Sequence, residues 1–238
     1  MQNPQILTAA ASRQGTRGHN ADAAVIHELA GTGIVGAAVV DGIGSNPEVA
    51  AYSTLAAQVA ARVGARKTAI LGILAAAELN AAPAGAWIEP DAVAVLAVVH
   101  PDDGSTSIAW TGDARAYGWD GAQLHQRTTD MTVAEYLRAN GFPVKATVAH
   151  EDWLRASLGR SSINTVHHSI IDDRLILLTS DGVHKQITHE RLTEIVRVYA
   201  EDPQALAEAI VNEPEPDAEG YRDDATVIVL SANGLSDV

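Results

Sequence analysis

Five aspartates of this sequence stand where apolar segments begin or end. "AAVVDG" ends with Asp41 and a glycine, "SIAWTGDAR" holds Asp113 between two β-type segments, and "LILLTSDG" leads into Asp181. The segment "YRDDATVIVL" places Asp223 and Asp224 just ahead of a final apolar run. One Asp-Gly pair after an apolar run is an ordinary turn signal. The repetition of the pattern predicts that these carboxylates meet at one edge of a sheet-based core.

Clustered carboxylates need a cation, because their charges repel one another. Two unit charges about 4 Å apart cost about 4 kcal/mol at an effective dielectric constant of 20. The chain has no cysteine, and its nine histidines show no ligand spacing. Aspartate oxygens alone favour hard ions such as Mg²⁺ or Mn²⁺ over Zn²⁺. The pattern therefore indicates a two-metal hydrolytic centre, to which Asp22, ahead of "AAVIHEL", adds a further acid.

The apolar pattern predicts the elements that would position these groups. A continuous apolar run over 34–40 is typical of a strand that is buried on both faces. Asn46 and Pro47 are suited to begin an alanine-rich helix that ends near Gly64. A second helix is predicted over 67–80, closed by "AAPAGAW".

Strands dominate the middle of the chain. We expect β-type segments at 92–99, 106–110 and 114–119 to form an antiparallel meander, with the "DG" at 120–121 as a hairpin turn. "TVAEYLRANG" has a capping-box pattern and a glycine stop. A polar, irregular stretch separates it from the strand "RLILLTS", which is followed by helices near 188–200 and 203–212, an acidic loop "NEPEPDAEGY" and the strand "ATVIVL". This order predicts packed sheets with helices on their outer faces.

Bulk composition excludes several classes of protein. At 238 residues and 47% hydrophobic content, we expect one domain over 1–238, with about 1–8 and 232–238 peripheral. A net charge of −14 argues against partners such as nucleic acid or an anionic membrane. Without cysteines, a secretory N-terminus or an apolar run of about 18 residues, the expectation is a soluble cytoplasmic protein.

Six short motifs then suggest a family. "RGHNADA", "VVDGIG", "GDARAY", "TTD" at 128–130, "LTSDGV" and "RDDATVIVL" stand in the order and spacing of one known class of enzyme. Over about residues 12–230, the sequence resembles the metal-dependent serine/threonine phosphatases of the PP2C (PPM) type, in their compact bacterial form. The resemblance implies an α+β fold: a central β-sandwich of two mainly antiparallel sheets, flanked by helices on both sides, with the metals at one end.

The resemblance also implies roles for individual residues. Asp41 would bridge two metal ions, and the carbonyl group of Gly42 would reach one of them. Asp181 and Asp223 would complete the shell of the first ion. Arg17 would hold the substrate phosphate, for which its planar guanidinium is well suited.

Other motif residues would stand beside this centre. Asp113 matches the position that holds a third, weaker metal ion in bacterial members of the family. Asn20, Asp22 and Asp224 would support the ligands from behind, and the role of Asp130 in "TTD" is left open.

The implied reaction is hydrolysis of phosphoserine or phosphothreonine by direct attack of a hydroxide that bridges two Mg²⁺ or Mn²⁺ ions. The partner would be a phosphorylated protein, the target of a serine/threonine kinase, and the enzyme would act as a monomer. Ala21 departs from the family pattern, which has a glutamate there that touches the second metal ion through water. Two alternatives therefore stay open: a pseudophosphatase that serves as a phosphoprotein-binding regulatory module, and a phosphatase for small phosphoesters or a phosphorylated regulator. No motif of a P-loop NTPase, a serine hydrolase or a zinc protease is present.

Overall fold

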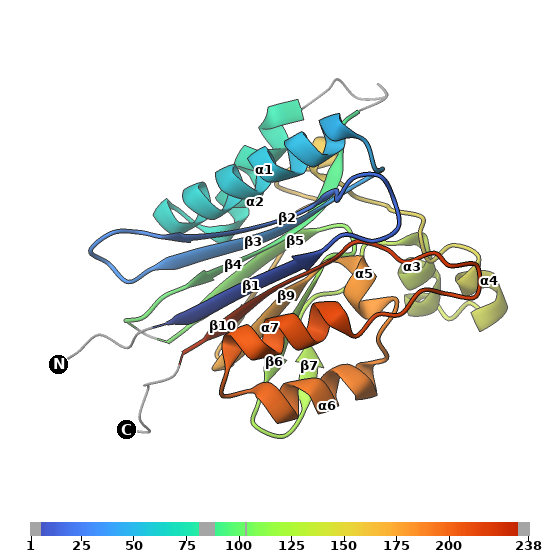
Figure 1. Cartoon of the computed structure of the whole chain (residues 1–238). Helices are drawn as coiled ribbons and strands as arrows, with labels where there is room; N and C mark the ends of the chain where they lie inside the picture. The colour runs from blue at the N-terminus through green and yellow to red at the C-terminus, as the bar shows by residue number, and fades with distance from the viewer. Residues whose placement is uncertain (1–5, 81–88, 103, 233–238) are drawn as a thin grey trace.

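Two five-stranded antiparallel sheets stack face to face in the computed structural model, which describes residues 6–80, 89–102 and 104–232 (Figure 1). The first sheet contains, in order across it, β1 (Leu7–Arg13), β10 (Ala225–Ser231), β9 (Leu175–Thr179), β6 (Arg115–Trp119) and β7 (Leu124–Gln126). The second contains β2 (Asp22–Glu28), β3 (Val35–Gly42), β4 (Ala92–Val99), β5 (Thr106–Thr111) and β8 (His167–Ile171). Every pairing between these strands is antiparallel.

Helices cover the outer face of each sheet (Figure 1). The second sheet is covered by α1 (Pro47–Arg66) and α2 (Ala69–Ala77), and the first by α6 (His189–Tyr199) and α7 (Pro203–Asn212). The short elements are η1 (Glu78–Asn80), α3 (Val133–Ala139), α4 (Val144–Val148), η2 (Leu158–Arg160) and α5 (Asp181–His184). The α+β sandwich flanked by helices on both sides is confirmed. No helix among the described residues is long and apolar enough to cross a membrane.

The alternation of side chains along each strand divides the core into layers. In β3, Ala37 and Val39 face the other sheet, whereas Ala38 and Val40 pack beneath α1 and α2. Both sets are fully buried, which explains the uninterrupted apolar run that predicted this strand. The layer beneath α1 and α2 is rich in alanine, so these helices can approach the sheet closely. A third layer, richer in leucine, isoleucine and valine, lies beneath α6 and α7.

Several predicted boundaries are confirmed by their caps. The Asn46 side chain accepts a hydrogen bond from the backbone N–H of Val49 at 2.9 Å at the start of α1. Thr132 accepts one from the backbone N–H of Glu135 at 3.2 Å at the start of α3, and Gly141 follows that helix with φ of +76°. The "AAPAGAW" closure of the second helix lies outside the described residues.

The predicted three-stranded meander is wrong. β4 pairs with β5, and β6 forms a hairpin with β7, but β5 and β6 belong to different sheets. The chain changes sheet at Gly112 and Asp113, between two segments whose apolar pattern is equally compatible with a hairpin. Sequence analysis also overlooked β1 and β8, because these edge strands are partly exposed and β8 reads "HHSII".

Candidate metal centre

A pocket of about 570 Å³ opens at one end of the sandwich. Four predicted aspartates reach it from four connections: Asp41 at the end of β3, Asp113 after β5, Asp181 after β9 and Asp223 before β10. Antiparallel strands order these connections so that residues far apart in sequence meet at one edge. Three further acids and two cations join them: Asp152, Glu215, Asp217, Arg17 and Lys185. The lining thus contains seven carboxylates and two cations.

Asp41 occupies the centre of this acidic group. The register of β2 and β3 sets it directly opposite Asp22. Burial raises the pKa of the Asp41 carboxyl well above its ordinary value, and repulsion from Asp181 and Asp22 raises it further. Burial likewise raises the pKa of Asp22 to about 7, although the Ser180 hydroxyl donates a hydrogen bond to it at 2.6 Å. Burial is the larger cause of both shifts, and repulsion from neighbouring acids adds to it, so both carboxylates would gain from a nearby positive charge.

Asp181 follows the buried strand β9 and is the first residue of α5. Its backbone N–H points to Asp41 Oδ2 at 3.4 Å. The next residue is glycine for a steric reason: a Cβ on Gly182 would lie 1.9 Å from the carbonyl oxygen of Asp224. The missing side chain lets α5 start against the segment that holds Asp223, which brings the two aspartates to the same pocket.

The loop between β1 and β2 brings Arg17 to the pocket, and a buried carboxylate holds that loop. Asp224, only 2% exposed, accepts hydrogen bonds from the backbone N–H groups of Gly15 at 2.7 Å and Ala21 at 2.9 Å. The Arg17 guanidinium forms an ion pair with Asp223 and lies 3.9 Å from Asp224 Oδ2. Burial raises the pKa of Asp223 and so does repulsion from Asp181, while Arg17 acts to lower it.

The remaining residues of the first two motifs shape the backbone. The Asn20 side chain accepts a hydrogen bond from the backbone N–H of Asp22 at 3.0 Å and donates one to Ser12 at 2.9 Å. Gly42 lines the pocket, and its backbone N–H donates to the Ala21 carbonyl at 3.1 Å. Ala21 is buried, and its methyl group offers no ligand where the family pattern has a glutamate.

Lys185 is the functional candidate that sequence analysis missed. Its Nζ lies 2.7 Å from Asp181 Oδ2, 2.7 Å from Asp152 Oδ1 and 3.4 Å from Asp113 Oδ2. Burial raises the pKa of Asp113 to about 6 and repulsion from Asp181 contributes, although Lys185 opposes both. The spacing of four residues from Asp181 in "SDGVHK" was the available signal, since an acid and a lysine four apart meet on a helical turn.

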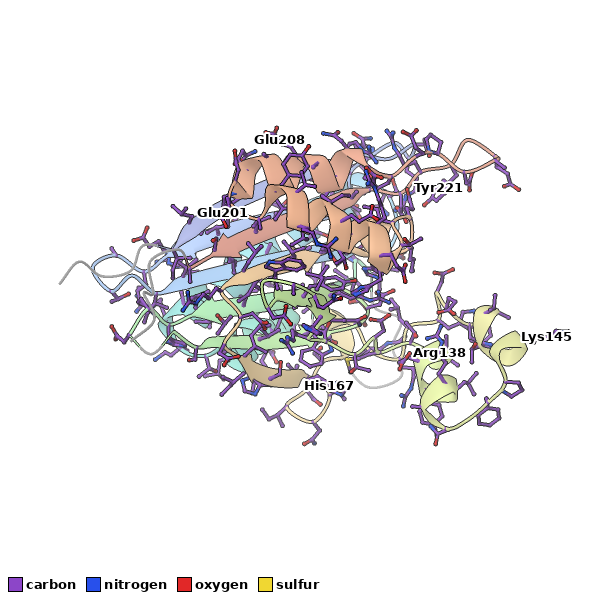
Figure 2. The ribbon with its side chains drawn as sticks, turned by 90° about the horizontal axis from the view of Figure 1, so that it is seen from below. Arg138, Lys145, His167, Glu201, Glu208 and Tyr221 are labelled. Carbon is purple, nitrogen blue, oxygen red and sulfur yellow. The ribbon has the colours of Figure 1, made fainter. Side chains whose placement is uncertain are left out.

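The acidic loop after α7 also belongs to the pocket. Glu215, Asp217 and Tyr221 line it, and Tyr221 lies on the same end of the molecule as the projecting α3 and α4, which carry Arg138 and Lys145 (Figure 2). The sequence shows that this loop is acidic, but Glu215 and Asp217 do not stand at the end of an apolar segment, so the pattern that predicted the other acids does not apply to them.

Asp130, whose role the sequence left open, forms an ion pair away from the pocket lining. It accepts two hydrogen bonds from the Arg115 guanidinium, at 2.8 Å to Nε and 2.6 Å to Nη2. Arg115 also donates to the Tyr117 hydroxyl at 3.2 Å. Asp130 therefore fixes the start of β6, directly after the turn that presents Asp113.

The donor chemistry of the pocket fits hard divalent ions. Its carboxylate oxygens are in excess over cations, and repulsion from Asp181 and Asp22 adds to the effect of burial in raising the pKa of Asp41. Among the described residues, however, no three acidic or histidine side chains are gathered in ligating geometry. Arg17 and Lys185 engage Asp223 and Asp181 instead. An ion at Asp223 would have to replace the ion pair with Arg17, and an ion at Asp181 would have to share that carboxylate with Lys185. The site is therefore suited to metal by composition without being a preformed cage.

Comparison with known proteins identifies the class of fold. No protein-family model matches the chain, and no curated protein sequence is significantly similar to it. Among solved structures, the fold matches that of bacterial PPM-type serine/threonine phosphatases along almost the whole chain.

Three of these structures illustrate the likeness. The serine/threonine phosphatase Stp1 from Staphylococcus aureus aligns with a TM-score of 0.71 and 18% identity, covering 95% of each chain. The phosphatase MsPP from Mycobacterium smegmatis, in complex with cacodylate, has a TM-score of 0.68 and 23% identity, with 95% of this chain and 99% of MsPP covered. The catalytic domain of PstP, in complex with two manganese ions, has a TM-score of 0.65 and 19% identity over 95% and 97% of the two chains.

Proposed function

We propose that the chain is a Mg²⁺- or Mn²⁺-dependent phosphatase that hydrolyses phosphoserine or phosphothreonine in proteins. The supporting observation is the pocket at the end of a PPM-type sandwich, lined by seven carboxylates and two cations. A phosphate dianion would be repelled from such a lining unless further positive charge accompanied it. Divalent ions supply that charge, and oxygen ligands without sulfur or imidazole suit Mg²⁺ and Mn²⁺.

Asp41, Asp181 and Asp223 are the side chains that would hold the ions, together with the Gly42 carbonyl. Asp41 is central because Asp22, Asp113 and Asp181 all act on its pKa. Bound ions of this kind lower the pKa of water and neutralise charge on a phosphoryl group, so that water can attack directly without a phosphoenzyme. A related fold, that of PstP, has been solved with two manganese ions, which supports two as the number here.

Arg17 would bind the phosphate of the substrate. Its guanidinium lines the pocket and is held by Asp223, a partner that it can leave once that carboxylate is neutralised. The loop below it is fixed by Asp224, so the guanidinium can turn while its backbone stays in place. Two parallel N–H donors then match two phosphate oxygens and stabilise the charge that develops during displacement.

The test is a phosphatase assay with p-nitrophenyl phosphate and with a phosphothreonine peptide, with and without Mn²⁺. We expect Mn²⁺-dependent turnover by the wild type and a loss of about a thousandfold in Asp41→Asn, the upper end of the effect expected when one group that stabilises the transition state is removed. Asp172→Asn is the matched control, because Asp172 is exposed in the turn before β9, at the opposite end of that strand from Asp181. Equal, metal-independent rates for wild type and Asp41→Asn would contradict the proposal.

A second candidate function is a pseudophosphatase that binds phosphoproteins without turnover. Ala21 in place of an acid, and the lack of three gathered ligands among the described residues, favour it. Calorimetric titration with Mn²⁺ separates the two functions. Two tight sites accompanied by turnover would eliminate the pseudophosphatase, whereas binding of the phosphopeptide without metal or turnover would favour it.

A further inference from the structure

Lys185 lies where three separate segments of the pocket meet. Asp181 comes from α5, Asp113 from the turn between β5 and β6, and Asp152 from the loop between α4 and η2. The Lys185 ammonium is 2.7 Å, 3.4 Å and 2.7 Å from an oxygen of each, respectively. An ammonium has three protons, so one donor is available for each carboxylate.

The three carboxylates differ in their access to water. The Asp113 side chain is 5% exposed and that of Asp181 19%, whereas that of Asp152 is 80% exposed. Among the described residues, Lys185 is the one cation that forms an ion pair with Asp113. Water cannot reach the Asp113 carboxylate to stabilise its negative charge, so the Lys185 ammonium stabilises it instead.

A metal ion shared by Asp113 and Asp181 would have to use the same space. Mg²⁺ is bound by oxygens at about 2.0–2.1 Å, so an ion between these two carboxylates would lie in the gap that Nζ already spans. Two cations cannot share that gap without strong repulsion.

We propose that Lys185 is a tethered cation that takes the place of a third divalent ion between Asp113 and Asp181, so that Asp113 anchors the lysine and does not ligate metal. This inference rests on the proposed function, in which Asp41, Asp181 and Asp223 hold two ions. The proposal limits the number of metal ions that the chain can bind. Ions bind on the Arg17 side of the pocket, where Arg17 contacts Asp223. The Lys185 side, where Lys185 contacts Asp113, Asp152 and Asp181, already has a permanent positive charge.

The experiment counts Mn²⁺ ions bound per full-length chain from the spectroscopic signal of free Mn²⁺ during titration. Lys185→Gln should bind one ion more than the wild type, with weaker affinity than the others. The double variant Lys185→Gln/Asp113→Asn should return to the wild-type number. Two control variants should bind the same number of ions as the wild type: Lys185→Arg, which keeps the charge, and Lys67→Gln, which changes an exposed lysine at the end of α1. Thermal melting of each variant verifies that it is folded.

The outcomes separate the two proposals. An unchanged number of ions in Lys185→Gln, or a wild type that loses an ion when Asp113 alone is changed to Asn, overturns the tethered cation. A wild type that binds no Mn²⁺ and has no phosphatase activity overturns the proposed function. In that event, a single ion gained by Lys185→Gln and lost again with Asp113→Asn would still support the role of Lys185, and no gain would contradict it.

Discussion

The two sides of the pocket neutralise their carboxylates in different ways. On the Arg17 side, a guanidinium from the loop between β1 and β2 forms an ion pair with Asp223, and its next acidic neighbour, Asp224, is 3.9 Å away and already occupied by backbone N–H groups. On the Lys185 side, an ammonium at the end of α5 contacts three carboxylates from three segments. Arg17 has one strong partner to lose, and Lys185 has three.

That difference suggests which cation takes part in binding substrate. Arg17 can exchange Asp223 for a phosphate at the expense of one ion pair, and its planar group suits two phosphate oxygens. Lys185 would have to leave three carboxylates at once. Burial acts to lower the pKa of Lys185, but Asp181 and Asp113 outweigh it and hold that pKa above its usual value. We therefore expect the Arg17 side to change during the reaction and the Lys185 side to remain in place.

The largest effect should come from removing the two cations in turn. Arg17→Ala should lower kcat by about 10²–10³-fold, the usual effect of losing one donor to a charged transition state. Lys185→Ala should lower it by about tenfold or less, because a partly exposed ion pair contributes on the order of 1 kcal/mol. Steady-state kinetics on a phosphothreonine peptide measures both. Equal losses in the two variants would remove the distinction between the two sides.

The next effect concerns stability in the presence of metal. Saturating Mn²⁺ at about a hundredfold excess over its dissociation constant should stabilise the fold by about 2.7 kcal/mol for one site. In a domain of this size, that raises Tm by about 5–11 °C. Asp223→Asn, on the Arg17 side, should lose much of this gain, whereas Asp113→Asn should keep it. Melting curves in Mn²⁺ and in EDTA provide the measurement. The same Tm under both conditions would contradict a metal site.

A smaller effect is expected from pH in the metal-free protein. The pKa of Asp22 is raised to about 7 and that of Asp113 to about 6, because burial and neighbouring acids favour their protonated forms. A carboxyl whose pKa is raised on folding stabilises the fold at low pH, and this contribution is lost as pH rises from about 4 to about 7. The Tm of the metal-free protein should therefore fall as pH rises through this range.

Asp22→Asn tests this interpretation of the pH dependence. An asparagine can still accept the hydrogen bond from the Ser180 hydroxyl, but it does not titrate. Melting in EDTA at pH 5 and pH 7.5 should therefore give a smaller difference for the variant than for the wild type. The same difference in both proteins would mean that Asp22 does not control the pH dependence of stability.

The two sides also differ in how far the sequence could predict them. Arg17, Asp41 and Asp223 stand in motifs whose spacing fixes their place beside strand ends, and the sandwich was predictable because β3, β4 and β10 are apolar on both faces. Lys185 owes its role to partners 33 and 72 residues away, Asp152 and Asp113, and only the fold brings them together. The false meander has the same origin, because an apolar pattern gives the face of a strand and not the sheet to which it belongs.

The smallest effect should come from Asp152, the exposed partner of Lys185. Its side chain is 80% exposed, so water screens its ion pair, and exposed pairs contribute at most about 1 kcal/mol. Asp152→Asn should therefore change Tm by no more than about 4 °C, and raising the salt concentration should shrink the difference between variant and wild type. Melting at low and high NaCl measures this. A larger, salt-independent loss would mean that Lys185 is held from the loop between α4 and η2 and not from Asp113 and Asp181, and the Lys185 side would then be as movable as the Arg17 side.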